Sequence, residues 1–226
     1  MTDYSEKFYG EYADRYAEVA RQLLQSVYIE SSHPGLTCDL DLLARLKELA
    51  PGKCGLDAGC GAGARDVYSF FLDGYEMSGI DAVPENIDVA SRLHPEIADN
   101  ISVADLREKL PFPSASFDFV MCNAVIQHIE PDLVKTVTLP ELARVLRKDG
   151  ILQLMFKNGS GLLTVYDKDY GVDRTFRLYD ENEILDFLDG LGLDLIESES
   201  EEQLGGIMFF TDPKPSPHCV FQMRKR

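Results

Sequence analysis

The spacing of apolar residues divides the 226-residue chain into parts of different character. Over roughly the first 50 residues, apolar side chains recur three and four positions apart, which predicts two helices. The first is expected to begin at Asp3, with Glu6 completing a capping box, and to run to about Val27. Leucines at helical spacing mark the second helix, which Pro51 and Gly52 end. The chain should therefore begin with a helical segment.

After this segment, short apolar runs alternate with helical ones. The alternation is typical of βαβ units, in which helices cover both faces of a parallel sheet. Helices are expected over 64–72 and 84–93, and a third, with a capping box of Thr138 and Glu141, ends at Lys148. The expected strands cover residues 54–58, 76–80, 101–103, 117–122 and 151–156.

The end of the chain follows a different pattern. Residues 157–179 are rich in glycine, tyrosine and charge and have no clear period. Asp180 then predicts the start of a helix that runs through Leu188. Two last strands are expected over 193–197 and 219–223. Together the elements predict an α/β fold of the Rossmann-like, doubly wound type, with a seven-stranded, mostly parallel sheet and a C-terminal antiparallel hairpin.

Charge and cysteine content narrow the classes of function. The chain carries 22 Lys and Arg against 39 Asp and Glu, and its net charge of −17 repels phosphate backbones and anionic headgroups. Nucleic acid and membranes are therefore not expected as partners. The five cysteines include no C-x-x-C pair, so neither a disulfide framework nor a metal site is expected. Since no apolar run approaches the roughly 20 residues that span a bilayer, we expect a cytoplasmic location.

The sharpest local feature is a glycine-rich turn at residues 55–63, between a predicted strand and a predicted helix. Three alternate glycines let the backbone turn tightly and approach a ligand at the helix N-terminus: Gly59, Gly61 and Gly63. The turn also fits the dinucleotide fingerprint loosely, with Asp81 near the ~20-residue offset of a ribose-binding acid. Asp57 favours a cationic ligand, because its carboxylate would repel a pyrophosphate.

Further motifs follow in order along the chain: Gly79-Ile80-Asp81, Ala104-Asp105-Leu106, Leu110-Pro111-Phe112-Pro113, Ser116-Phe117-Asp118 and the segment 144–150. With the glycine turn, they make the chain over 49–156 resemble the class I S-adenosylmethionine-dependent methyltransferases of the small-molecule type. The resemblance implies S-adenosyl-L-methionine as the cofactor and a small-molecule acceptor with an oxygen or nitrogen nucleophile. Methyl transfer is then an in-line displacement, for which the enzyme chiefly positions the two reactants.

The resemblance also implies where the cofactor lies. Asp57 would lie beside its methionine end, Asp81 would accept from both ribose hydroxyls, and Asp105 would take the adenine amine. Tyr9 and Tyr16 belong to a segment similar to an N-terminal Tyr-x-x-x-Ala-x-x-Tyr pattern that covers the cofactor in such enzymes. The implied cofactor-binding residues are Asp57, Gly59, Cys60, Gly61, Gly63, Asp81, Ala82, Asp105, Leu106, Asn123, Tyr9 and Tyr16.

The length fits one domain, since domains commonly hold roughly 100 to 200 residues. Within this single methyltransferase domain, 1–226, we expect an N-terminal helical lid over 1–50 and a cofactor-binding core over 51–157. Residues 158–226 would form a substrate-side segment and the C-terminal hairpin. The expected assembly is a monomer or a homodimer.

His128 is the candidate catalytic residue. It lies five positions after Asn123, beside the expected methyl group, and a neutral imidazole can act as a general base near neutral pH. The alternative is a histidine that lines the pocket without chemistry. Arg174 and Arg177 could hold a substrate anion, although pairing with neighbouring acids is the simpler interpretation.

Two other functions stay open at this point. A nicotinamide-linked Rossmann oxidoreductase shares the glycine turn and the strand-end acid, but the sequence shows no catalytic Tyr-x-x-x-Lys pair. A non-enzymatic binding or scaffold subunit could keep the fold without turnover, because a fold does not fix a function. The intact cofactor residues count against this second alternative.

Overall fold

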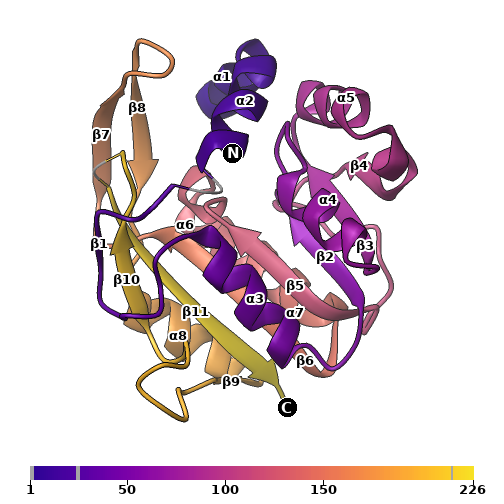
Figure 1. The fold of residues 1–226 in the computed structure, drawn as a ribbon, viewed down its shortest axis with the longest axis vertical. Coiled ribbons are helices and arrows are strands. Elements are labelled where there is room, and N and C mark those ends of the chain that lie inside the picture. The colour runs from indigo at the N-terminus through magenta and orange to yellow at the C-terminus, as the bar shows by residue number, and fades with distance from the viewer. Residues whose placement is uncertain (1–2, 24–25, 215) are drawn as a thin grey trace.

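The computed structural model describes residues 3–23, 26–214 and 216–226. Its centre is a nine-stranded sheet in the order β1-β10-β11-β6-β5-β2-β3-β4, with β9 paired to β11 (Figure 1). Five neighbouring strands are parallel: β2 (Cys54–Ala58), β3 (Glu76–Asp81), β4 (Ile101–Val103), β5 (Phe117–Asn123) and β6 (Leu146–Lys157). The antiparallel strands are β1 (Glu30–Ser31), β9 (Leu193–Leu195), β10 (Met208–Thr211) and β11 (Pro217–Lys225).

Helices cover both faces of this sheet. One face carries α3 (Asp39–Leu49), α4 (Arg65–Leu72) and α5 (Pro84–Leu93). The other carries α6 (Pro131–Leu133), the π-helical segment η3 (Val134–Thr138), α7 (Leu139–Val145) and α8 (Glu181–Gly190). Two 3-10 segments, η1 (Pro95–Asn100) and η2 (Ile126–His128), lead into β4 and α6. The layers confirm the predicted doubly wound α/β fold.

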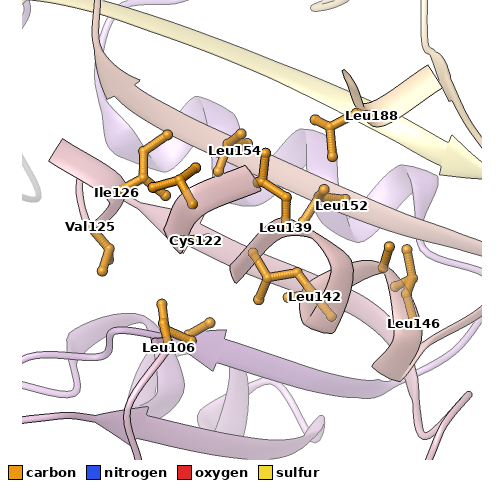
Figure 2. Packing of buried hydrophobic residues seen from close by; sticks show 14 of the residues in the cluster. Leu106, Cys122, Val125, Ile126, Leu139, Leu142, Leu146, Leu152, Leu154 and Leu188 are labelled. Atoms are coloured by element: carbon orange, nitrogen blue, oxygen red, sulfur yellow. The ribbon is translucent and has the colours of Figure 1, made fainter. Parts of the chain in front are cut away.

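The largest apolar cluster lies between the sheet and the α7–α8 layer. Figure 2 shows Leu139 and Leu142 of α7 beside Leu152 and Leu154 of β6, with Leu188 of α8 nearby. All five side chains are fully buried. Burying one leucine stabilises a fold by roughly 1.5 to 3 kcal/mol. This layer therefore holds β5 and β6 firmly below the strand ends that form the site.

The N-terminal helices α1 (Asp3–Glu11) and α2 (Ala13–Leu23) lie beside a separate hairpin of β7 (Leu162–Asp167) and β8 (Val172–Arg177) (Figure 1). We call these two helices the lid, after the predicted role. Aromatic side chains join the two parts. The ring centroid of Phe8 lies 4.9 Å from that of Tyr12 and 5.0 Å from that of Tyr170, in the turn of the hairpin. The lid is thus packed against the hairpin.

The first predicted helix differs from the structure. It is divided at Tyr12 into α1 and α2, and Val27 lies outside any helix with 70% of its surface exposed. Tyr28 gives a reason, because its ring stacks on Phe210 of β10 at 3.9 Å and draws the chain toward the sheet edge. The expected cap by Asp3 lies outside the side chains that the structure describes.

The predicted capping box at Thr138 and Glu141 is wrong. Thr138 lies inside a continuous helical stretch, and its hydroxyl donates to Leu106 O at 2.8 Å. Glu141 accepts from Leu110 N at 2.8 Å and pairs with Arg144 at 2.7 Å. Both side chains therefore fasten the loop after β4 to this helix, a tertiary role that the local sequence does not reveal.

The same helix ends earlier than the sequence predicts. α7 ends at Val145 and not at Lys148. Leu146 is already extended and pairs with Phe117 of β5. Asp149, with φ of +62°, lies in the left-handed region, in which a right-handed helix cannot continue.

The sheet contains nine strands, whereas the sequence predicts seven. The C-terminal antiparallel pair is confirmed, since β9 pairs with β11, and β1, β10 and the β7–β8 hairpin are additional. The predicted cap of α8 is confirmed, because Asp180 accepts from Asn182 N and Glu183 N. Among the helices of the described ranges, none is both long and apolar enough to cross a bilayer. The division into 1–50, 51–157 and 158–226 stays a prediction.

Candidate active site

The glycine-rich turn connects β2 to α4. The backbone N–H groups of Gly59 and Cys60 both donate to Ile80 O, at 2.8 and 2.9 Å, and so tie the turn to the end of β3. Gly59 has φ of +104°, and a Cβ atom at this position would lie 2.3 Å from Val125 Cγ2. Glycine is required here because both the backbone conformation and the missing side chain are needed.

Asp81, the last residue of β3, holds the turn from the other side. Its buried carboxylate accepts from Gly61 N at 3.0 Å, Val83 N at 2.9 Å and Asn86 Nδ2 at 3.0 Å. Burial raises the pKa of Asp81, and these three hydrogen bonds oppose the shift. The carboxylate therefore fixes the glycine turn relative to the start of α5.

A cleft opens between the glycine turn, the ends of β3 and β5, and the lid. The space between atoms in it is about 540 Å³. Nine of the residues expected from the sequence line this cleft: Tyr9, Tyr16, Gly59, Asp81, Ala82, Asp105, Leu106, Asn123 and His128. The sequence does not single out six others: Ile80, Asn86, Ala104, Ala124, Val125 and Ile129. Of these, only Asn86 gives a signal, a polar residue in the first turn of α5 shortly after Asp81.

Four expected residues do not line the cleft: Asp57, Cys60, Gly61 and Gly63. A Cβ atom on Gly61 would lie 2.8 Å from the ring of Tyr16, and Gly63 faces the backbone of Ala17 in α2. Burial raises the pKa of the Cys60 thiol, which keeps it protonated. The two glycines therefore allow the lid to approach the turn.

Two buried polar groups near the turn lack partners. Asp57 is 5% exposed, and its carboxylate has no hydrogen bond to another residue of the described ranges. Burial, followed by repulsion from Asp66, raises the pKa of Asp57. Asn86 Oδ1 is also buried without a hydrogen-bond partner in the same part of the chain. A ligand with an ammonium group and hydroxyl donors fits these two acceptors.

Binding of a cationic ligand beside Asp57 is expected to weaken as the pH falls and the carboxylate becomes protonated. The ionised carboxylate attracts the cation and the protonated form does not, and a pKa above the usual value of about 3.9 moves this loss to higher pH. Calorimetric titration with S-adenosylhomocysteine at several pH values measures the effect. Asp57→Asn is the control and should bind more weakly with a flatter pH dependence. A flat profile in the unsubstituted chain contradicts the assignment.

Asp105 connects its side of the cleft to the lid through Arg107. Its carboxylate accepts from Arg107 N at 2.8 Å and from Arg107 Nε at 2.9 Å, and Arg107 also pairs with Glu6 of α1. Burial favours a higher pKa for Asp105, but the hydrogen bonds from Arg107 lower it. The carboxylate of Asp105 stays ionised. Because it already accepts hydrogen bonds from Arg107, the predicted hydrogen bond from the adenine amine would be an additional one to the same carboxylate.

His128 lies on the opposite wall, buried beneath α1. Its Nδ1 is 3.4 Å from Ser5 Oγ, and its Nε2 is 3.2 Å from the Tyr9 hydroxyl. Arg174 Nη2 donates to this hydroxyl at 2.5 Å, so the hydroxyl donates in turn to Nε2. Burial and the charges of Arg174 and Lys157 lower the pKa of His128 well below its usual value. The imidazole is therefore neutral at pH 7, as a general base requires, but its lowered pKa makes it a weaker base than an exposed histidine.

A chain of buried amides reaches Asn123 from within the sheet. Gln222 Nε2 donates to Gln153 Oε1 at 3.0 Å, and Gln153 Nε2 donates to Asn123 Oδ1 at 3.2 Å. Both glutamines are fully buried, on the adjacent strands β11 and β6. Because Oδ1 of Asn123 accepts from Gln153, its amide N–H groups are left for the cleft.

The strand order and the cleft at the carboxyl ends of the strands are typical of nucleotide-binding α/β domains. Residues 56–154 match a family model described as a methyltransferase domain. Over these residues the chain is similar to the class I S-adenosylmethionine-dependent methyltransferases, as the sequence predicts, and S-adenosylmethionine is the methyl donor of that class. These matches favour a methyltransferase over the nicotinamide-linked oxidoreductase.

Two curated relatives each match about half of the chain. It is 36% identical over 114 residues to the uncharacterized methyltransferase YcgJ of Bacillus subtilis, which covers 50% of this chain and 44% of the relative. It is 35% identical over 107 residues to 2-methyl-6-phytyl-1,4-hydroquinone methyltransferase of Synechocystis sp., which covers 47% of this chain and 33% of the relative. The matched part spans less than half the length of each relative.

A solved structure with a bound acceptor shares the fold. It is the 1,6-didemethyltoxoflavin-N1-methyltransferase of Burkholderia thailandensis, with 1,6-didemethyltoxoflavin and S-adenosylhomocysteine bound. The TM-score is 0.59 with 21% sequence identity, and the match covers 80% of this chain and 75% of the other. At this identity, the likeness establishes the architecture alone.

Proposed function

We propose that this chain transfers the methyl group of S-adenosylmethionine to an oxygen or nitrogen nucleophile of a small-molecule acceptor. The observation that carries the proposal is the methyltransferase-domain match over residues 56–154, and the buried carboxylate of Asp57 at the glycine turn supports it. A negative group in an enclosed site favours a cationic donor over a pyrophosphate. Hydroquinone and toxoflavin acceptors, named for two similar proteins, support a small molecule as the acceptor.

Residues of the cleft and of the glycine turn behind it have proposed roles in binding. Asp57 would attract the ammonium group of the methionine portion, and Asn123 would donate to its backbone atoms. Asp81, with Ala82 beside it, would accept from the ribose hydroxyls. Asp105 and Leu106 would contact the adenine, while Tyr9 and Tyr16 would cover the cofactor from the lid. Cys60 and the turn glycines Gly59, Gly61 and Gly63 would shape the backbone around the methionine end.

The donor supplies a methyl group already activated by positive sulfur, so the residues chiefly orient the acceptor and exclude water. Where the nucleophile carries a proton, His128 would accept it at Nε2. The Tyr9 hydroxyl lies between this nitrogen and Arg174, and it would relay the proton from the acceptor. The neutral imidazole required for this step is favoured by the lowered pKa of His128.

An acceptor-dependent turnover assay tests the proposal. The full chain is incubated with methyl-labelled S-adenosylmethionine and separate pools of phenols, amines, carboxylates and tRNA, and labelled product and S-adenosylhomocysteine are measured. Transfer to a small-molecule pool and none to tRNA is expected. Binding of the donor without transfer to any pool would favour the scaffold alternative, and transfer only to tRNA would exclude a small-molecule acceptor.

A further inference from the structure

A second, smaller cavity lies beside the cleft. It is formed by α1, η2 and β8, and Tyr9 and His128 line both spaces, so these two side chains separate them. Methyl transfer requires the nucleophile to approach within about 3 to 3.5 Å of the methyl carbon. An acceptor that reaches the methyl group must therefore extend into the cleft past Tyr9 and His128, while the rest of it lies on the side of this cavity.

Two buried cations lie against one aromatic ring of this cavity. The guanidinium carbon of Arg174 is 4.9 Å from the ring centroid of Phe176, and Lys157 Nζ is 4.6 Å from the same centroid. Arg174 is 9% exposed and Lys157 is 6% exposed. Burying a charge is unfavourable unless paired groups or an anion compensate it.

The positive charge of Lys157 is only partly compensated by other groups of the protein. Its ammonium group donates to Ser216 Oγ at 2.6 Å and to His218 Nε2 at 3.3 Å, which are both neutral acceptors. Among the residues that the structure describes, no carboxylate lies within 4.0 Å of it, although Asp212 is near enough to attract it. Burial lowers the pKa of Lys157 to about 8. One of its three N–H donors has no hydrogen-bond acceptor among those residues.

Arg174 also retains capacity for an anion. Its Nη1 donates to Asp167 at 3.0 Å and its Nη2 donates to the Tyr9 hydroxyl, which uses two of five N–H donors. Asp167 is shared, because Lys214 donates to both of its oxygens at 2.9 Å. By contrast, Arg177 forms a more exposed pair with Glu130. Arg177 therefore pairs with a neighbouring acid, which is the simpler of the two interpretations offered by the sequence. Arg174 differs because it is buried and lines the second cavity.

We infer that the methyl acceptor is an anion, a small molecule whose carboxylate binds Arg174 beside the cofactor cleft. Lys157 does not line the cavity, and its charge on the ring of Phe176 adds to the attraction. This inference rests on the proposed function and adds the chemical class of the acceptor. The planar guanidinium matches a carboxylate through two parallel hydrogen bonds. The rings of Phe8, Tyr9 and Phe176 surround it and exclude water, which strengthens the pairing. An ammonium acceptor would meet two like charges there.

Calorimetry on the full chain saturated with S-adenosylhomocysteine tests this inference. The probes are benzoate and 4-hydroxybenzoate, with benzamide and 4-hydroxybenzamide as uncharged counterparts. Each carboxylate should bind at least about tenfold more tightly than its amide, as expected for a buried charged pair. Arg174→Gln and Lys157→Met should each weaken carboxylate binding by at least about tenfold. Arg177→Gln, the matched control on the same strand, should stay within about threefold.

Circular dichroism and binding of S-adenosylhomocysteine establish first that each variant is folded. If Arg174→Gln does not fold, Lys157→Met carries the test. The inference is overturned if the carboxylates do not bind at millimolar concentration, if the amides bind as well, or if folded variants keep full carboxylate affinity. Failure of the unsubstituted chain to bind S-adenosylhomocysteine at all would contradict the proposed function instead.

Discussion

Replacing Asp81 with alanine should weaken the binding of S-adenosylhomocysteine by at least about tenfold and up to about 1000-fold. The carboxylate accepts hydrogen bonds from Gly61 N, Val83 N and Asn86 Nδ2, and it is proposed to accept from the ribose as well. A hydrogen bond to a charged group contributes about 1.5 to 3 kcal/mol, and about 1.4 kcal/mol is tenfold in affinity. Calorimetric titration measures the change.

The same substitution should also lower the free energy of unfolding, because it leaves the N–H groups of Gly61 and Val83 without acceptors. Each buried unpaired group costs about 1 to 3 kcal/mol. Asp88→Ala is the matched control, since it removes the same charge from an exposed position of α5 and should change neither quantity appreciably. An unchanged dissociation constant in folded Asp81→Ala would exclude the ribose contact and the role of the carboxylate in holding the turn.

Replacing His128 with alanine should lower kcat by about 100- to 10,000-fold on an acceptor that carries a proton, which is the range typical of general-base catalysis. Affinity for S-adenosylhomocysteine should remain within about threefold. Because the pKa of His128 is lowered, protonation of the imidazole should reduce the rate only at pH values below its usual pKa of about 6.5. The acid limb of the pH–rate profile that belongs to His128 should disappear in the variant.

His33→Ala serves as the control for this substitution, because His33 accepts from Gly35 N at 3.0 Å in the loop before α3 and does not line the cleft. Its kcat should be unchanged within about threefold. If His128→Ala also retains kcat within about threefold, far short of the general-base range, then positioning alone drives the transfer. His128 would then only line the pocket and orient the Tyr9 hydroxyl.

Local sequence predicts the parallel core of the fold well. The strand that ends at Ala58 and the helix from Pro84 to Leu93 agree with the structure, because each has a strong period and a clear boundary. The glycine turn and Asp81 are equally local, since a turn that requires φ above zero selects glycine at Gly59. These features position most of the cleft.

Contacts between segments that are far apart in the sequence determine the parts of the fold and the site that local sequence does not predict. Thr138 is helical and bonds to Leu106, 32 residues away, so its resemblance to an N-cap is misleading. Strand β1 has two residues and exists through its pairing with β10, which no local period indicates. The buried cations Arg174 and Lys157 lie 17 positions apart in the sequence and meet only because β8 packs above the end of β6.

The central claim is that the cleft binds the methyl donor of the methyltransferases and not a nicotinamide dinucleotide. Isothermal titration of the full chain with S-adenosylhomocysteine and, separately, with NAD tests this claim most directly. The account predicts saturable binding of S-adenosylhomocysteine with one site per chain, and no measurable binding of NAD at the same concentrations. Saturable binding of NAD, with none of S-adenosylhomocysteine, would contradict it.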